Sequence, residues 1–248
     1  MGAEYARLHT DLQQLLGLSA HPVAITFSDV EPDGIERFDA AMPPAAEDGR
    51  TGRVPAGCVF WIRATERAFV TVPDDHANCS VGSFTHGLKS MEDISTNGDV
   101  AALVAAEWVS PADFSKVASV KSRSNFIVYG PLRDMKSDPN VVFVRLNGKQ
   151  LMMLHDAWPG ARMEGKPQCH IIPIAKEDGE VAVSVGCMLS RVRTGMSNND
   201  ISCAIPWAVL PDLIDRLRVA VAADERVAEY AAADSRRFQQ RDQPVAPP

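Results

Sequence analysis

The stretch CVFWIRATERAFVTVPDDHANCSVG, residues 58–82, has a near counterpart in CHIIPIAKEDGEVAVSVGCMLSR, residues 169–191. Each stretch begins with a cysteine and a short apolar element, turns through charged residues, continues as a β-branched strand and reaches a second cysteine. Short runs rich in Val, Ile, Phe and Thr are typical of buried strands. The paired pattern predicts two similar units, each with one cysteine before a strand and one after it.

The order of elements around these stretches also repeats. A strand is predicted at 23–27, ahead of the first stretch, and another at 141–146, ahead of the second. We expect an α+β fold with a mixed sheet and flanking helices, built from two related halves at about 20–120 and 121–210 around a pseudo-twofold axis. Helices at 206–238 complete a single domain of residues 1–240, and residues 239–248 are predicted to be a disordered tail.

Two further segments carry turn and loop signals. Residues 30–57 contain several Pro and Gly and are predicted to be a long surface loop. Residues 188–199 are polar and are predicted to be irregular. An N-terminal amphipathic helix is predicted at about 3–18 because its leucines recur at helical spacing.

Composition narrows the class of protein. The chain has 248 residues, 46% of them hydrophobic, so it can bury a sizeable core. A formal net charge of −7 argues against binding to nucleic acid or to an anionic membrane, since both need a basic surface. No run approaches the length of a membrane span and the first residues lack a secretion signal, so we expect a cytoplasmic protein. Five cysteines are too few for a disulfide scaffold.

The two cysteine pairs suggest one shared site. If the two units pack against each other, Cys58 and Cys79 would meet Cys169 and Cys187 although about 90 residues separate the pairs. Four thiolates suit a zinc ion or an iron–sulfur cluster. The short spacings of small zinc modules and ferredoxins are absent from the sequence. The sequence thus predicts four candidate metal ligands, Cys58, Cys79, Cys169 and Cys187, and leaves open that they are ordinary packing residues.

One of these cysteines is also a candidate nucleophile. Ser80, Val81 and Gly82 suit the first turn of a helix, whose free backbone N–H groups would face Cys79 and favour its thiolate. Cys79 is therefore our candidate catalytic residue. Cys203 lies outside the pattern and is predicted to be a buried strand residue.

Polar residues near the cysteines could bind a ligand or carry protons. Arg191 and Arg193 follow Cys187 in a polar loop and could hold a carboxylate or phosphate, although solvated loop charge is an equal alternative. Three histidines lie close to the cysteines in sequence, and each could replace a thiolate as ligand or donate a proton: His76, His86 and His170.

At these same residues the chain resembles the domain-of-unknown-function family 169. Several short motifs occur in the family's order, and they cover most of residues 20–210: Pro22-Val23-Ala24-Ile25, Cys58, Cys79-Ser80-Val81-Gly82, Gly130-Pro131-Leu132, Asp138-Pro139-Asn140-Val141-Val142, Cys169, Ser184-Val185-Gly186-Cys187 with Arg191, and Ile205-Pro206. The resemblance implies a cytoplasmic, cysteine-containing α/β domain, sometimes suspected of holding a metal or iron–sulfur centre. It assigns no catalytic residue.

Three functions follow as hypotheses. The leading one is a cytoplasmic metal- or iron–sulfur-binding protein with redox or small-molecule chemistry at the centre. The second is a metal-free enzyme that uses one activated cysteine. The third is a non-catalytic protein that binds a small anion. The sequence does not name a reaction.

Overall fold

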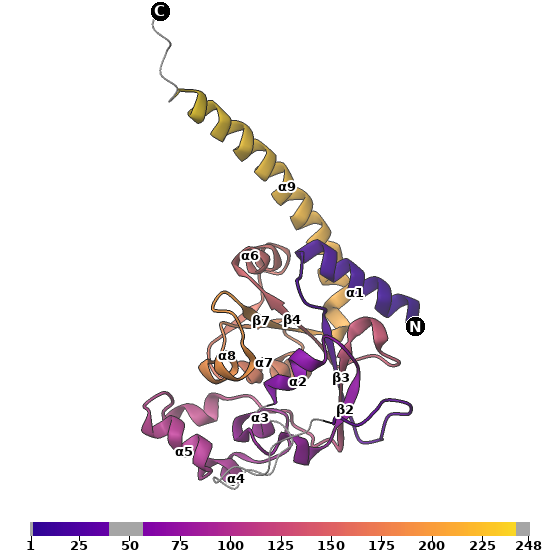
Figure 1. Cartoon of the computed structure of the whole chain (residues 1–248), viewed down its shortest axis with the longest axis vertical. Helices are drawn as coiled ribbons and strands as arrows, with labels where there is room; N and C mark the ends of the chain where they lie inside the picture. The colour runs from indigo at the N-terminus through magenta and orange to yellow at the C-terminus, as the bar shows by residue number, and fades with distance from the viewer. Residues whose placement is uncertain (1, 40–56, 242–248) are drawn as a thin grey trace, which may run out of the picture.

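A single mixed sheet organises the chain. The computed structural model describes residues 2–39 and 57–241, with side chains up to residue 238 (Figure 1). Seven strands lie in the order β2-β3-β1-β4-β7-β6-β5, and only β5 and β6 run parallel to each other. Their bounds are Val23–Ser28 (β1), Phe69–Thr71 (β2), Phe126–Pro131 (β3), Val141–Leu146 (β4), Arg162–Glu164 (β5), Ala182–Ser184 (β6) and Ile201–Pro206 (β7). The predicted α+β class with a mixed sheet is confirmed.

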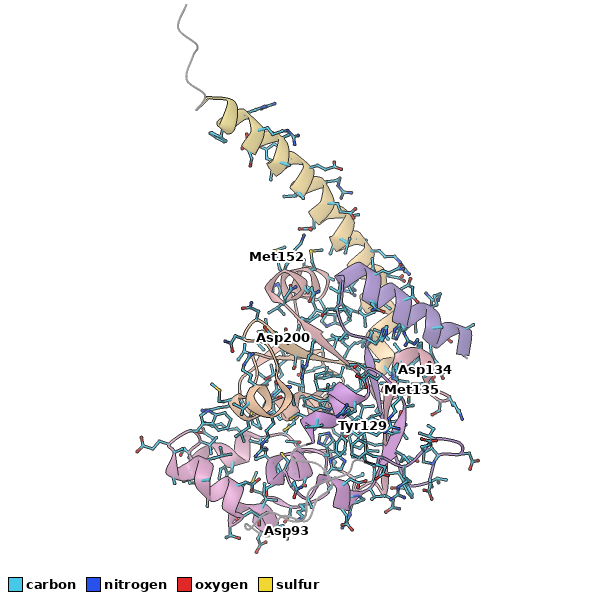
Figure 2. All side chains as sticks on the ribbon, in the orientation of Figure 1. Asp93, Tyr129, Asp134, Met135, Met152 and Asp200 are labelled. Carbon is cyan, nitrogen blue, oxygen red and sulfur yellow. The ribbon has the colours of Figure 1, made fainter. Side chains whose placement is uncertain are left out.

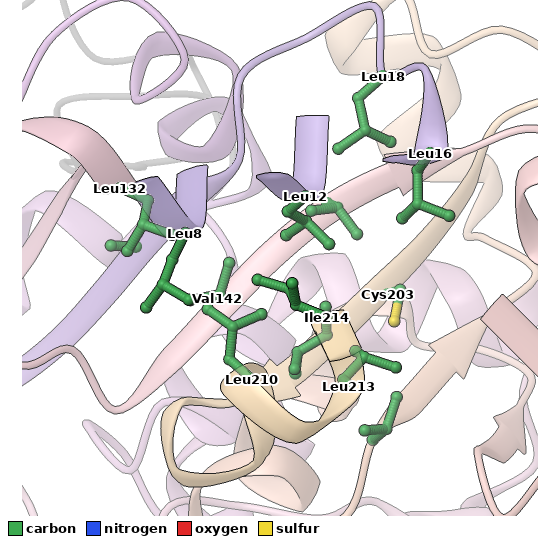
Figure 3. Packing of buried hydrophobic residues seen from close by; sticks show 14 of the residues in the cluster. Leu8, Leu12, Leu16, Leu18, Leu132, Val142, Cys203, Leu210, Leu213 and Ile214 are labelled. Carbon is green, nitrogen blue, oxygen red and sulfur yellow. The ribbon is translucent and has the colours of Figure 1, made fainter. Parts of the chain in front are cut away.

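One face of the sheet is covered by three helices. They are α1 (Gly2–Leu16), α6 (Gly148–Ala157) and the long α9 (Leu210–Arg241). Figure 3 shows Leu8 and Leu12 of α1 close to Leu210 and Ile214 of α9, above Val142 in the central strand β4. Because side chains alternate along a strand, the neighbouring residues of β4 point to the opposite face.

The opposite face of the sheet carries the aromatic core and leads to the cysteines. Phe60 of α2 (Cys58–Arg63) stacks on Tyr129 of β3 with ring centroids 5.5 Å apart, and Trp61 lies 4.5 Å from Phe143 of β4. The short helix α7 (Ile171–Pro173) adds Ile171 and Ile172 to the same cluster. This packing positions the first cysteine of each pair, because Cys58 is the first residue of α2 and Cys169 lies just before α7.

The remaining helices form a separate group beyond this face. They are α3 (Ser80–Thr85), α4 (Met91–Ser95) and α5 (Gly98–Ala105), with α8 (Met188–Thr194) packed near α2 (Figure 1). Short helical turns connect the elements: η1 (Pro73–His76), η2 (Pro111–Lys116), η3 (Leu132–Asp134), η4 (Gln168–His170), η5 (Ile174–Asp178) and η6 (Trp207–Val209). Residues of these helices and turns form most of the wall of the pocket that contains the four paired cysteines.

The strand order is consistent with two related halves. The antiparallel pair β1 and β4 lies between β2-β3 on one side and β7-β6 on the other, so corresponding strands occupy mirrored positions. Strand β5, which pairs in parallel with β6, has a short counterpart in the first half, where Arg37 forms an isolated parallel bridge with Val70 of β2. The pseudo-twofold axis itself stays a prediction.

Two segments differ from the sequence-based expectation. Residues 188–199, predicted to be irregular, contain the helix α8, which ends at Gly195 in a left-handed conformation. Helix α9 reaches Arg241, three residues into the range predicted as a tail, and residues 242–248 lie outside the described residues. Most of the predicted loop at 30–57 also lies outside them. Among the described residues, no helix combines the length and the apolar character needed to cross a membrane.

Candidate functional site

The four paired cysteines line one pocket. Cys58 begins α2, Cys79 directly precedes α3, Cys169 lies in η4, and Cys187 directly precedes α8. All four contribute to the wall of a cavity whose empty space, including its open mouth, is about 590 Å³. The structure therefore brings together the cysteines that the sequence pairs, while their role as ligands stays a prediction. Cys203 is fully buried and belongs to the cluster on the opposite face of the sheet.

Most of the pocket wall is apolar. Trp61 and Trp108 contribute aromatic rings, and the aliphatic and proline residues are Val81, Leu103, Pro167 and Leu189. Its polar residues are fewer: His86, Asp99, Gln168, Ser190 and Arg193. The thiols therefore face a space that is shielded from bulk water on most sides, where a charge is costly unless it is compensated.

Burial favours the protonated form of three of the thiols, those of Cys58, Cys79 and Cys169. It raises the pKa of Cys58 to about 11, and the nearby Cys79 raises it further. Burial also raises the pKa of Cys79, with a smaller contribution from Asp99. It moves the pKa of Cys169 well above the ordinary range, and repulsion from the other three cysteines adds to this shift. The guanidinium of Arg193 acts in the opposite direction on Cys58 and Cys79. The four sulfurs are thus close enough to influence one another electrostatically.

Cys79 occupies the predicted position at the start of a helix. Its Sγ accepts a hydrogen bond from the backbone N–H of Gly82 at 3.4 Å. This contact and that from Gly57 lower the pKa of Cys79, but burial outweighs them and the net shift is upward. The expected activation of Cys79 by its helix is therefore too weak to favour the thiolate unless a positive charge is added.

A hydrogen-bonded group fixes the helix that follows Cys79. Asp99 of α5 accepts from the backbone N–H of Ser80 at 3.0 Å and from its hydroxyl at 2.6 Å. The side-chain amide of Asn97 donates to the same hydroxyl at 2.8 Å. The start of α3 is thereby held against α5. Asp99 was missed by the sequence reasoning, because nothing in its spacing relates it to Ser80.

His86 lines the pocket, and one of its ring nitrogens has no partner among the described residues. Its Nδ1 donates to the carbonyl oxygen of Gly82 at 2.9 Å, and its buried Nε2 has no hydrogen-bond partner among the described residues. Burial lowers the pKa of His86 to about 4, so the ring is neutral near pH 7 and Nε2 carries a free lone pair. A neutral imidazole with its other nitrogen held by a carbonyl is the form that binds metals.

Other buried polar groups of the pocket are also unpaired among the described residues. They are the indole Nε1 of Trp61 and both side-chain amide atoms of Gln168. Buried donors and acceptors nearly always find a partner, so these groups point to a ligand that the cavity accommodates. The two other histidines near the cysteines lie outside the pocket wall: His76 contacts the hydroxyl of Thr71, and His170 Nε2 lies 3.2 Å from the carboxylate of Glu164.

The two candidate arginines have different surroundings. The guanidinium of Arg191 donates to the backbone carbonyl oxygens of Val185 and Asp200 at 2.9 and 3.0 Å and to that of Ser197. Arg191 therefore links the backbone before Cys187, at Val185, to the backbone at Ser197 and Asp200. Arg193 lines the pocket and has no hydrogen bond or ion pair among the described residues. Of the two, Arg193 is the one placed to meet a ligand.

The four cysteines lie around the pocket wall and do not converge on one position for a metal ion. Within residues 2–39 and 57–241, no group of three or more His, Cys, Asp or Glu side chains is arranged to hold a metal ion. A single tetrahedral zinc ion would bring its sulfurs to about 3.8 Å from one another, given Zn–S bonds of about 2.3 Å. A mononuclear site would therefore require the cysteine-bearing turns to move inward.

Comparison with known proteins places the chain in a family. A family model for DUF169, described as uncharacterised ArCR, matches residues 11–216, which is most of the chain. The chain belongs to this family. No curated protein and no solved structure matches it.

Proposed function

We propose that this DUF169 member binds a thiolate-ligated metal centre, and that an iron–sulfur cluster held by Cys58, Cys79, Cys169 and Cys187 fits the pocket best. The observation that carries the proposal is that four cysteines from four separate turns line one cavity. The fifth cysteine, Cys203, is buried on the other side of the sheet, as expected of a cysteine that only packs.

The energetics of the thiols support a bound cation. Three of the four have raised pKa values, mainly because of burial, and for Cys58 and Cys169 partly because of the other cysteines. A metal supplies the positive charge that makes their deprotonation favourable, so binding would release protons and stabilise the fold. Four half-buried thiols gathered around one cavity have no such benefit if they serve only as packing.

Because no three potential ligands among the described residues converge on one ion position, a cluster with separated ligands is favoured over a single ion. In a [4Fe–4S] cluster each thiolate binds a different iron atom, so the sulfurs stay farther apart than around one zinc ion. The unpaired N–H groups of Trp61 and Gln168 are suitable donors to the sulfides and thiolates of a cluster. Hydrogen bonds of this kind, together with burial, set the reduction potential of such centres.

The other residues of the pocket wall would determine which reactions a bound metal centre can support. A bound cluster supplies electron transfer or Lewis-acid chemistry. Trp61, Trp108 and Leu103 exclude water from the thiols, and Arg193 places a positive charge beside Cys58 and Cys79. His86 offers a neutral Nε2 that can bind iron or accept a proton.

An enzyme with one activated cysteine is the second candidate function. The observation that favours it is the hydrogen bond from Gly82 to Cys79, with Arg193 nearby. The raised pKa of Cys79 weakens it, because a protonated thiol is a poor nucleophile. Rapid alkylation of Cys79 alone, in metal-free protein, would favour this candidate over the first.

The test is anaerobic purification followed by metal analysis. We expect about two or about four iron atoms per chain with matching acid-labile sulfide, and a visible absorption band. Serine replacements of Cys58, Cys79, Cys169 and Cys187 should each reduce the iron content severely. The matched control Cys203→Ser should keep it. About one zinc per chain without iron would assign a mononuclear site, and wild-type protein that takes up neither metal after reconstitution would refute the proposal.

A further inference from the structure

A second cavity adjoins the cysteine pocket. Its empty space, including its open mouth, is about 440 Å³, and its described wall contains none of the four paired cysteines. Four residues line both cavities: Val81, Leu103, Trp108 and Pro167. The two cavities therefore lie side by side and share an apolar wall.

The second cavity is lined by apolar and aromatic side chains. The elements α3, α4, α5 and η2 each contribute a large one, namely Phe84, Met91, Leu103 and Phe114. These four side chains are only half-buried, although α3, α4 and α5 pack against one another. On α4, Asp93 points outward at this end of the molecule (Figure 2), while the adjacent Ile94 is 1% exposed and lines the cavity. Apolar surface that faces a cavity in this way suits an apolar guest.

Polar groups without partners occur in the neighbouring cysteine pocket. Gln168 is 2% exposed, and neither side-chain amide atom has a hydrogen-bond partner among the described residues. The indole Nε1 of Trp61 is an unpaired donor in the same wall. Buried groups of this kind point to a ligand that supplies the missing partners.

The charge of the cysteine pocket favours an anionic ligand. Arg193 lines the pocket and forms no ion pair with another described residue. The carboxylate in the pocket wall, Asp99, already accepts two hydrogen bonds from Ser80. In metal-free protein burial favours the protonated form of Cys58, Cys79 and Cys169. The guanidinium of Arg193 is therefore available to a carboxylate.

We propose that the two cavities together bind a small molecule with a hydrocarbon tail and a carboxylate head, with the tail in the second cavity and the head beside Arg193. Leu103 and Trp108 line both cavities and would contact the middle of this ligand. The tail lies apart from the cysteines, so a metal centre and the tail can be bound together. The position of the head next to such a centre rests on the proposed function, whereas binding of the tail does not.

A series of saturated carboxylates tests the tail site. Isothermal titration calorimetry on the metal-free full chain would use hexanoate, octanoate and decanoate, each below its micelle concentration. We expect about one ligand per chain and an affinity that rises about fourfold with each added methylene, because each methylene is buried in the apolar cavity. This series needs no variant, so it does not depend on the folding of one.

Three substitutions separate the tail from the head. Phe114→Asp places a charge in the apolar cavity and should weaken decanoate binding about tenfold or more. Val117→Trp fills part of the same cavity, so it should weaken decanoate more than hexanoate. Arg193→Met should weaken decanoate about tenfold and leave decanol unchanged, because the alcohol carries no charge. Val219→Asp is the matched control, at an α9 side chain that is 71% exposed and outside both cavities, and it should bind decanoate like the wild type.

The opposite results are equally specific. An affinity that is the same for hexanoate and decanoate would overturn the proposed tail site, and so would folded Phe114→Asp and Val117→Trp proteins that bind decanoate like the wild type. An equal loss of decanoate and decanol binding in Arg193→Met would overturn the position of the head. Circular dichroism and the thermal midpoint show whether each variant is folded. Protein that binds decanoate but takes up no metal would refute the metal centre alone, and protein that takes up iron but does not bind decanoate would refute the tail site alone.

Discussion

The backbone N–H of Gly82 donates to Sγ of Cys79 at 3.4 Å, and a Cβ at residue 82 would lie only 3.1 Å from the same sulfur. Helix α3 therefore lies closer to the thiol than a side chain at residue 82 would allow without a shift. In an ordinary helix interior, a change from Gly to Ala stabilises by roughly 0.5–1 kcal/mol. At residue 82 the added methyl group must displace the sulfur or the helix.

We therefore predict that Gly82→Ala lowers the metal content of the pocket without unfolding the protein. The sulfur would be shifted by a few tenths of an ångström from its position beside the cavity, while the helix propensity of alanine compensates for part of the strain. Iron and sulfide per chain, measured with the thermal midpoint, test this. Gly98→Ala is a matched control, because no atom lies within 4 Å of its added Cβ. Unchanged iron in Gly82→Ala would mean that the close contact has no role in the centre.

The structure also predicts a role for Arg191 that differs from anion binding. Its guanidinium connects the carbonyl oxygens of Val185, Ser197 and Asp200, and it lies so close to Gly186 that a Cβ there would come within 2.8 Å of it. Gly186 has φ of 111°, which few other residues adopt. Arg191 therefore helps to shape the turn that places Cys187 at the pocket.

We predict that Arg191→Met lowers the free energy of unfolding by about 1–3 kcal/mol, because three carbonyl groups lose a charged donor. It should also increase the rate at which Cys187 is alkylated in metal-free protein. Urea denaturation and mass-spectrometric mapping of modified cysteines provide the two readouts. Val192→Ala, at a neighbouring side chain that is 78% exposed, should change neither. An anion-dependent thermal shift that disappears in Arg191→Met would instead support the anion-binding hypothesis.

Sequence patterns predicted the cysteine arrangement but not its surroundings. The two stretches could be paired because strands and charged turns have local signatures, and these strands lead their cysteines to the same side of the sheet. Asp99 and Gln168 could not be found in this way, since their importance comes from tertiary neighbours. The partners of Arg191 are backbone carbonyls, which no residue type reveals, so its contacts could not be predicted from the sequence.

The errors in predicting helices α8 and α9 have a similar origin. Helix α8 is only seven residues long and contains serine, arginine and threonine, so its periodicity was too weak to predict. Its start at Cys187 becomes understandable only from the packing near α2. Helix α9 has a polar second half that suggested an early end. What continues it is the helical propensity of its Ala, Glu and Arg residues.

Arg193 provides a test of the proposed centre that does not remove a ligand. A positive charge beside a cluster stabilises its reduced, more negative state, so we predict that Arg193→Met makes the reduction potential more negative. Arg193→Lys should fall between the two. Redox titration followed by absorbance or electron paramagnetic resonance measures the change. A potential that is equal in all three proteins would place Arg193 outside the influence of the centre.

A buried histidine far from the pocket should make the fold sensitive to acid. His9 of α1 is buried, with Nε2 3.1 Å from Nδ1 of His21, and the guanidinium of Arg133 lies near both rings. Burial lowers the pKa of His9 to about 4, and the charge of Arg133 contributes in the same direction.

Because the pKa of His9 is lower in the folded than in the unfolded chain, acid favours the unfolded state. The stabilising contribution is fully present above about pH 6.5 and is lost as the pH falls toward about 4, by at most about 3 kcal/mol. We predict that His9→Gln flattens the pH dependence of the free energy of unfolding across this window. The exposed His155→Gln is the control and should retain the wild-type slope. Urea titrations at a series of pH values measure both, and equal slopes for wild type and His9→Gln would contradict the assignment.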